Sequence, residues 1–336
     1  MLRRALIAAV VALSWGGTAR ADPLALRIGW AQAPAQLTPL AAELAKRHPE
    51  IFPGAGRSYV MQPLFFRGST PQIQALAAGE LELASLGPST FTLAVVNAHV
   101  DLRVVADVMQ DGAPGHYSTW WAVRKDGPVQ TPEDMKGRRA ALNALGATTD
   151  IVLREVMRKH GVADNSYTVI ETNFASMFAM IENDKVDVVP VMPQFSPDFE
   201  ATGRYRPLFT HVDISGTTQV GMWCMRADVI AAHRPVLVDF FTDYMRAVRW
   251  FLDPRNHAEA LDIAIAVTKE SKESLAYAFT ARDLYHSPDL LPNVPSIQKD
   301  IDEAVDMKVL PTRLVVAPRY VDLSLIEDAK ARLERK

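Results

Sequence analysis

Short apolar runs alternate along the chain with longer amphipathic stretches. Runs at residues 24–30, 58–66, 81–86 and 102–108 have the length of buried strands, and helix-like spacing follows the first three. The first helix ends near Arg47. The second covers residues 71–78, with Ser69 as its expected cap and Gly79 as its stop, and the third begins at residues 87–89. The first third of the chain therefore predicts a β-loop-α series.

A second series of the same kind begins near residue 131. It predicts strands at 139–142, 167–171 and 186–191, and helices at 147–160 and 174–183. The second and third loops are 19 residues apart in each series, from Gly68 to Gly87 and from Asn173 to Met192. Two β-loop-α series with equal spacing predict two similar α/β lobes with mostly parallel sheets.

Two further strands connect the predicted lobes. Residues 119–124 and 217–226 each contain tryptophan and end in arginine, and we interpret them as two crossing strands of a hinge. One lobe would then hold residues 22–117 plus 222–336, and the other residues 118–221. The rest of the chain predicts helices at residues 235–252, 258–267, 272–284 and 296–307.

The first 21 residues predict export. Arg3 and Arg4 precede a short apolar run, and Ala19-Arg20-Ala21 forms a small-residue cleavage site, as in secretory signal peptides. The alternative is an apolar first helix of the fold. Cleavage after Ala21 removes three arginines and changes the net charge from −3 to −6. We expect a soluble protein in a Gram-negative periplasm.

Composition excludes several kinds of chemistry. The net charge of −3 gives no basic footprint for nucleic acid, and the single cysteine, Cys224, excludes an internal disulfide framework. No nucleophile elbow, phosphate loop or dinucleotide fingerprint occurs, and the scattered histidines do not predict a metal site. Of these, only His116 lies beside candidate cleft residues, and we expect it on a surface loop. The sequence predicts neither a cofactor nor a catalytic residue.

Three loops at strand ends offer a binding site made of backbone. Small residues followed by a helix present free amide groups and the positive end of the helix to a ligand. Helix capping alone also explains each loop. Because strand ends of both lobes would meet at one edge, we expect a shared cleft. The three loops are Gly68-Ser69-Thr70, Gly87-Pro88-Ser89 and Gly146-Ala147-Thr148-Thr149.

Several side chains near these loops are candidates for ligand contact. Asn143 and Thr148 would reach the ligand from the second lobe. Arg67 is either a clamp for a carboxylate or sulfonate, or a solvated surface group. An apolar or aromatic ligand body could pack on four aromatic residues that could equally be core, namely Trp30, Trp120, Trp121 and Phe174.

The chain resembles the periplasmic solute-binding proteins for aliphatic sulfonates, taurine and nitrate, which share their fold with thiamin-precursor binders. The similarity covers about residues 24–252. Its motifs are LRIGW at 26–30, FFRGSTPQ at 65–72, AAGELELASLG at 77–87, PEDMKGRR at 132–139 and DVVPV at 187–191.

The resemblance implies a two-lobed α/β fold of type II, with two hinge strands and a helical C-terminal extension. It implies a monomer that captures a small organic anion and delivers it to an inner-membrane ABC permease and its ATPase. Two places depart from the family pattern. One is Arg67, and the other is Met192-Pro193-Gln194, where relatives often show an aromatic-acid-proline run. The implied site residues are Trp30, Gln32, Gly68, Ser69, Thr70, Gly87, Pro88, Ser89, Trp120, Asn143, Gly146, Ala147, Thr148, Asn173, Met192, Gln194 and Gln219.

Two alternatives remain open at this point. A periplasmic sensor that serves a membrane receptor would have the same sequence features. An enzyme of the thiamin-precursor-synthase type would share the fold, but the cysteine-rich motif of that family is missing.

Overall fold

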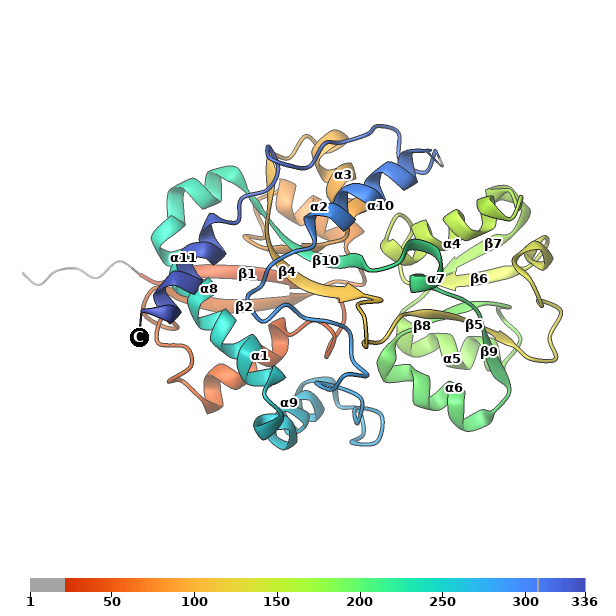
Figure 1. Cartoon of the computed structure of the whole chain (residues 1–336), viewed down its shortest axis with the longest axis horizontal. Coiled ribbons are helices and arrows are strands. Elements are labelled where there is room, and N and C mark those ends of the chain that lie inside the picture. Colours follow the sequence, from red (N-terminus) through yellow and green to blue (C-terminus); the bar gives the residue numbers. More distant parts are fainter. Residues whose placement is uncertain (1–21, 307, 336) are drawn as a thin grey trace, which may run out of the picture.

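The computed structural model describes residues 22–306 and 308–335, so the predicted signal peptide lies outside the described residues. Each half of the molecule contains a two-stranded and a three-stranded sheet, which one isolated bridge joins into a series of five strands, and the strand order is the same in both halves. Figure 1 shows the two halves side by side. The first runs β2 (Tyr59–Phe65), β1 (Leu24–Trp30), β3 (Ala84–Leu86), β10 (Thr218–Arg226) and β4 (Leu102–Asp111). The second runs β7 (Thr168–Glu171), β6 (Arg139–Leu142), β8 (Val189–Val191), β5 (Trp120–Arg124) and β9 (Tyr205–Thr210).

Both sheets are mixed rather than mostly parallel. The first three strands of each half run parallel, as predicted, with single bridges Ile28–Leu83 and Ala140–Val188 completing the two sets. However, β10 runs antiparallel to β3 and β4, and β5 runs antiparallel to β8 and β9. The reason is topological, because each of these strands arrives from the other half and enters at the edge where its neighbours end.

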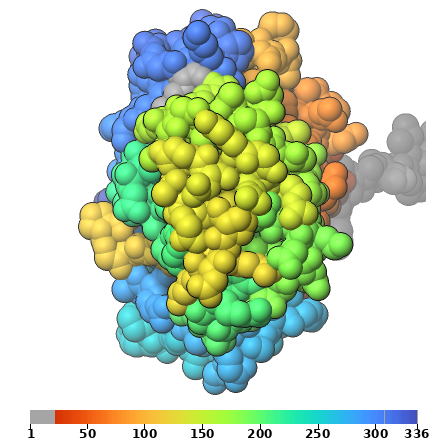
Figure 2. Space-filling view, turned by 90° about the vertical axis from the view of Figure 1, so that its right-hand side faces the viewer, coloured from red at the N-terminus to blue at the C-terminus, as the bar shows by residue number. Residues whose placement is uncertain are grey.

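The chain crosses between the halves just before β5 and β10, in residues 112–119 and 211–217. We expected the crossings inside the tryptophan-bearing strands, but each of these strands lies within a sheet. The proposed lobe limits stay a prediction, and the limit at residue 221 falls inside β10. Figure 2 shows the face formed by the second half, in yellow and green, with C-terminal segments in blue above and below it.

Helices cover both faces of both sheets. In β10, Trp223 packs in the core under one face while Met222 and Cys224 pack under the other, as strand alternation requires. One face of the first sheet carries α1 (Thr38–Arg47), α8 (Ala227–Leu252), α9 (His257–Thr268) and α11 (Ser324–Glu334). The other carries α2 (Thr70–Ala77), α3 (Pro88–Val96) and α10 (Val294–Asp306). The second sheet lies between α4 (Thr148–Lys159) on one face and α5 (Phe174–Glu182) and α6 (Ser196–Thr202) on the other.

The C-terminal third differs most from the prediction. Residues 272–284 form turns instead of a helix, because Phe279 has a φ of +59° and the Asp283 carboxylate accepts the N–H groups of Phe279 and Leu284. Helix α8 begins at Ala227, eight residues before the predicted start at Pro235, with a non-helical residue at His233. Helices α6, α7 (His211–Ser215) and α11 and strand β9 were not predicted.

Helix ends and short turns show three further features. Ser69 occupies the N-cap position of α2, but its side chain makes no capping bond, which corrects the prediction. Within residues 22–306 and 308–335, no helix is apolar over a length that could cross a membrane. Short 3₁₀ turns lie at Pro132–Met135, Asp164–Ser166, Pro193–Phe195 and Pro254–Asn256.

Candidate functional site

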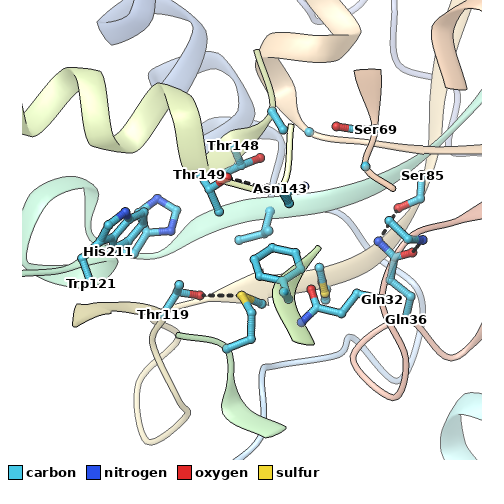
Figure 3. A pocket seen from close by; sticks show the side chains of 18 residues that line it. Gln32, Gln36, Ser69, Ser85, Thr119, Trp121, Asn143, Thr148, Thr149 and His211 are labelled. Carbon is cyan, nitrogen blue, oxygen red and sulfur yellow. Dashed lines mark hydrogen bonds between the residues drawn. The ribbon is translucent and has the colours of Figure 1, made fainter. Parts of the chain in front are cut away.

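A cavity lies between the two sheets, at the edge where the strands of each half end (Figure 3). Its volume is about 70 Å³, which is room for a small polar group or a few water molecules. We call it the inner cavity. Its walls are Ala31, Gln32, Gln36, Gly68, Ser69, Ser85, Gly87, Met109, Thr119, Trp121, Asn143, Ala147, Thr148, Thr149, Phe174, Met192, His211 and Val220.

Helices α2, α3, α4 and α5 begin at the inner cavity. The residues at the starts of α2, α3, α4 and α5 that line it are Ser69, Gly87, Thr148 and Phe174. The first N–H groups of a helix have no partner within the helix, and the helix dipole makes that end positive. The strand-loop-helix order of the sequence therefore directs amide donors of both halves toward one small volume.

Hydrogen bonds between the walls fix several polar side chains. Gln36 Nε2 donates to Ser85 Oγ at 3.0 Å, and Gln36 Oε1 accepts the N–H of Ala31 at 2.7 Å. On the opposite wall, Thr149 Oγ1 donates to Asn143 Oδ1 at 2.5 Å. Figure 3 shows these two pairs facing each other across the cavity. The polar walls are thus held in place before any ligand enters.

Two donors at the inner cavity have no partner among the described residues. Gln32 Nε2 and Trp121 Nε1 are buried and make no hydrogen bond, and both residues line the cavity. A buried donor without an acceptor is destabilising by about 1–3 kcal/mol. A ligand that accepts hydrogen bonds would satisfy a donor of this kind that faces the cavity.

The walls of the inner cavity carry no carboxylate, and His211 is their one ionisable residue. Asp150 lies close by, in the first turn of α4, and its negative charge there would oppose an anion. Its carboxylate instead accepts the Gly146 N–H at 2.8 Å and pairs with Arg154 at 2.9 Å. The Gly146 N–H and Arg154 therefore largely compensate the negative charge of Asp150.

His211 forms a buried pair with Asp111. Its Nδ1 lies 3.5 Å from Asp111 Oδ2, and both side chains are at most 5% exposed. Burial by itself would lower the pKa of His211, but the nearby carboxylate raises it. Likewise, burial would raise the pKa of Asp111, but His211 lowers it. This pair was not predicted from the sequence.

A second, more open pocket adjoins the inner cavity and shares Ala31, Gln32 and Phe174 with it. We call it the outer pocket. Its volume is about 470 Å³. Its remaining walls are Trp30, Ala33, Phe65, Arg67, Asn173, Ala175, Gln194, Phe195, Val267, Thr268 and Glu270. Arg67 is exposed there, and the Trp30 and Phe65 rings meet edge to face with centroids 5.0 Å apart.

Most of the predicted site residues line one of these two spaces. Gln32, Gly68, Ser69, Gly87, Asn143, Ala147, Thr148 and Met192 line the inner cavity. Trp30, Arg67, Asn173 and Gln194, with Gln32 again, line the outer pocket. The six that line neither are Thr70, Pro88, Ser89, Trp120, Gly146 and Gln219.

The positions of these six have local explanations. Trp120 points to the far face of the sheet, where its Nε1 donates to Ser196 Oγ at 3.1 Å, and its neighbour Trp121 takes the place in the cavity. Gln219 is fully buried and donates to Asp107 Oδ1 at 2.6 Å. Pro88 and Ser89 are buried in the first turn of α3, and Gly146 supplies a turn with a φ of +73° before α4.

Thr70 contacts the opposite half instead. Its Oγ1 donates to the Leu145 carbonyl at 3.0 Å, and Asn143 Nδ2 lies 3.5 Å from the Arg67 carbonyl. The loops of the two halves therefore touch beside the inner cavity.

Sequence reasoning missed Ala31, Gln36, Ser85, Met109, Thr119, His211 and Val220. Thr119 directly precedes β5 and Val220 is the third residue of β10, and both strands enter their sheets at the cavity. These positions can be found in the sequence once the crossings are placed. His116, which lies beside candidate cleft residues in the sequence, is outside both spaces. Its Nδ1 contacts the Asp283 carbonyl at 3.2 Å.

Comparison with known proteins identifies the family. Residues 65–256 match the family model described as NMT1/THI5 like, and the chain belongs to that family. The comparison with curated protein sequences returned no match.

Solved structures share the fold at low sequence identity. The alkanesulfonate-binding protein SsuA from Xanthomonas axonopodis pv. citri, bound to MOPS, has a TM-score of 0.68 and 20% identity over 90% of this chain and 99% of its own. The nitrate-binding protein NrtA from Synechocystis PCC 6803 has a TM-score of 0.70 and 13% identity over 94% of this chain and 90% of its own. The desulfurization enzyme DSZB has a TM-score of 0.63 and 11% identity over 92% of this chain and 99% of its own. These likenesses confirm the predicted two-lobed type II periplasmic binding protein fold with its helical C-terminal part.

The one cysteine of the chain is not placed to react. Cys224 is fully buried in β10, and burial raises the pKa of its thiol, so it is neither accessible nor ionised. Among the described residues, no three histidine, cysteine or acidic side chains are grouped so that they could hold a metal ion.

Proposed function

We propose that this protein is the periplasmic substrate-binding component of an ABC importer and captures a small organic anion, a sulfonate or a carboxylate. The anion binds in the inner cavity, between a lobe of residues 22–117 plus 222–336 and a lobe of residues 118–221. The observation that carries the proposal is the donor-rich, carboxylate-free wall of that cavity, with Gln32 Nε2 and Trp121 Nε1 unpaired among the described residues.

Binding follows from the geometry of the walls. The helix starts and side-chain amides donate to the anion, while Met109, Met192 and Val220 exclude water and strengthen those hydrogen bonds. Release requires the loops around Thr70 and Leu145 to separate, so hinge opening controls the exchange of ligand. Closure also joins the outer surfaces of both lobes into one face for the permease.

The names of the structural neighbours support this function. Two are binding proteins for an alkanesulfonate and for nitrate, both anions. The predicted signal peptide, cleaved after Ala21, would deliver the chain to the periplasm as a soluble monomer. There it would hand its ligand to an inner-membrane permease with its ATPase.

A ligand screen tests the proposal. Purified residues 22–336 are heated with methanesulfonate, taurine, MOPS, acetate, benzoate or nitrate, and with the uncharged methanesulfonamide as a matched control. A ligand at 100 times its Kd raises the free energy of unfolding by about 2.7 kcal/mol. We expect stabilisation by an anion and none by the control, one site per chain by calorimetry, and contraction in solution scattering.

Recovery of the ligand separates binding from catalysis. We expect mass spectrometry to return the bound anion unchanged after overnight incubation. Turnover without any added partner would support the enzyme alternative instead. Stabilisation by cations or neutral solutes alone would contradict the anion assignment, and pull-down of a membrane receptor in place of a permease would favour the sensor alternative.

A further inference from the structure

We infer that His211, held as an imidazolium by Asp111, is the cation that neutralises this carboxylate so that the anion can bind, and that ligand binding is thereby coupled to one proton. This inference rests on the proposed function, because it concerns the charge of the ligand in the inner cavity.

His211 stands at the wall of the inner cavity. It is the first residue of α7, directly after β9, and its side chain is about 5% exposed. Its ring meets the Trp121 indole edge to face, with centroids 6.3 Å apart, and the two side chains lie next to each other in Figure 3. Its Nε2 lies 3.4 Å from Thr218 Oγ1.

Asp111 supplies the charge behind the histidine. It ends β4, and its Oδ2 accepts the N–H of Thr119 at 2.9 Å. Its Oδ1 is buried and has no hydrogen-bond partner among the described residues. A buried carboxylate that is only partly hydrogen-bonded is costly without a nearby cation. His211 is the group placed to provide that charge, at 3.5 Å.

The other charged groups around His211 belong to α4 and α10. Glu155 of α4 and Asp300 of α10 both raise the pKa of His211. Glu155 pairs with Lys159 at 2.7 Å, while burial raises the pKa of Asp300 to about 7. Lys299 donates to the Ser215 carbonyl at 2.5 Å and lies 3.8 Å from Glu303. Acidic groups thus outnumber cations on the protein side of the imidazole, and this surplus favours its charged form.

Protonation decides whether an anion can enter. With a neutral His211, the inner cavity would place the anion near the uncompensated charge of Asp111, whereas an imidazolium makes the pair neutral. Arg67 cannot substitute for it, because this side chain is exposed in the outer pocket. The amide groups at the helix starts can then donate hydrogen bonds to the anion without repulsion from Asp111.

The coupling predicts the direction of a pH effect. A bound anion favours the imidazolium and so raises the pKa of His211 above its value in the free protein. Below the free-protein value, affinity does not change with pH. Above it, each unit of pH weakens binding by about tenfold, until the value of the complex is reached.

Two measurements test the inference, and the first needs no ligand. The imidazole of His211, assigned by comparison with His211→Gln, is titrated by NMR in ¹⁵N-histidine-labelled protein. We expect a pKa above the ordinary value of about 6.5, and a further rise when methanesulfonate or nitrate saturates the protein. The matched control is His116→Gln, which removes a partly buried histidine outside both binding spaces.

Calorimetry between pH 5.5 and 9 supplies the second measurement. We expect wild type and His116→Gln to lose affinity for the probe anion above the pKa of His211. His211→Gln should bind at least about tenfold more weakly at neutral pH and show no such dependence, while circular dichroism reports whether it is folded. Proton uptake on binding, read from the buffer dependence of the heat, measures the coupling in the wild-type protein even if that variant does not fold.

The outcomes separate this inference from the proposed function. A His211 that is neutral at pH 7 in the free protein overturns the inference, whatever binds. Anion binding that is independent of pH, or a pKa that does not move in the complex, overturns the inference and leaves the function standing. If no anion binds at any pH, both are wrong.

Discussion

The inner cavity and the outer pocket share three residues but differ in almost every physical property. The inner cavity is small and carries neutral donors fixed by hydrogen bonds, with His211 as its one ionisable group. The outer pocket is several times larger and combines aromatic rings with the exposed Arg67. We therefore propose that charge is recognised in the inner cavity, although the arginine that the sequence suggested, Arg67, lies in the outer pocket. The outer pocket can add contacts to a ligand with an apolar extension.

The largest effect should follow from filling the inner cavity. A β-carbon at Gly87 would lie 2.6 Å from Thr148 Oγ1 and 3.2 Å from the Val220 carbonyl oxygen. We expect Gly87→Val to hold the two halves apart and to weaken anion binding at least about a hundredfold, or ~2.7 kcal/mol. Calorimetry measures the affinity, and scattering should show loss of contraction. Because Gly87 has a φ of −86°, the fold should tolerate the change. Wild-type affinity in this variant would mean that ligand binds elsewhere.

Asn143→Ala and Thr148→Ala remove single polar groups from the same space. Each should weaken binding by up to about tenfold, since one hydrogen bond contributes about 0.5–1.5 kcal/mol. Asn183→Ala is the matched control, because Asn183 is exposed at the far end of α5 and its side chain bonds only to the Ala179 carbonyl among the described residues. If both variants bind normally, the loop before α4 serves as a helix cap and not as a contact.

Phe174→Ala probes the boundary between the two spaces. The ring contacts both, so its loss should let water into the inner cavity and weaken binding by about fivefold, or ~1 kcal/mol. The loss should be greater for benzoate than for acetate, because the larger ligand extends past the boundary. Equal losses for the two ligands would place both of them wholly inside.

Arg67→Ala should have the smallest effect. Exposed charges contribute little, so we expect a loss below about threefold that disappears at high salt. Arg67→Lys keeps the charge and should bind as the wild type does. A loss of affinity of tens-fold in both variants would instead mean that Arg67 binds the charged group of the ligand directly. Charge would then be recognised in the outer pocket and not in the inner cavity.

The fold was predictable because it depends on local patterns. Strands at 24–30 and 139–142 coincide with β1 and β6, and the helices that follow the glycine-containing loops begin within a residue or two of their predicted starts. Residues 272–284 have a helical pattern, but the carboxylate of Asp283 stabilises turns there, and nothing in hydrophobic spacing reveals such a contact. Tertiary context decided that segment.

The site was predictable to the level of loops. Backbone loops such as Gly68–Ser69 and Ala147–Thr148 followed from the strand-loop-helix order. The choice between Trp120 and Trp121 depends on which face of β5 meets the cavity, and strand alternation leaves both open. His211 could not be found, because its importance comes from Asp111, 100 residues earlier, at the end of another strand.

The interleaving of β10 affects the order in which the chain can fold. Every strand of the second sheet lies between residues 120 and 210, whereas the first sheet needs β10 to insert between β3 and β4, more than 100 residues after them in the chain. Closing so long a loop is slow, because its entropy is lost before the contacts form. We therefore expect the second sheet to assemble first during refolding and to persist as an intermediate, while the first waits for its missing strand.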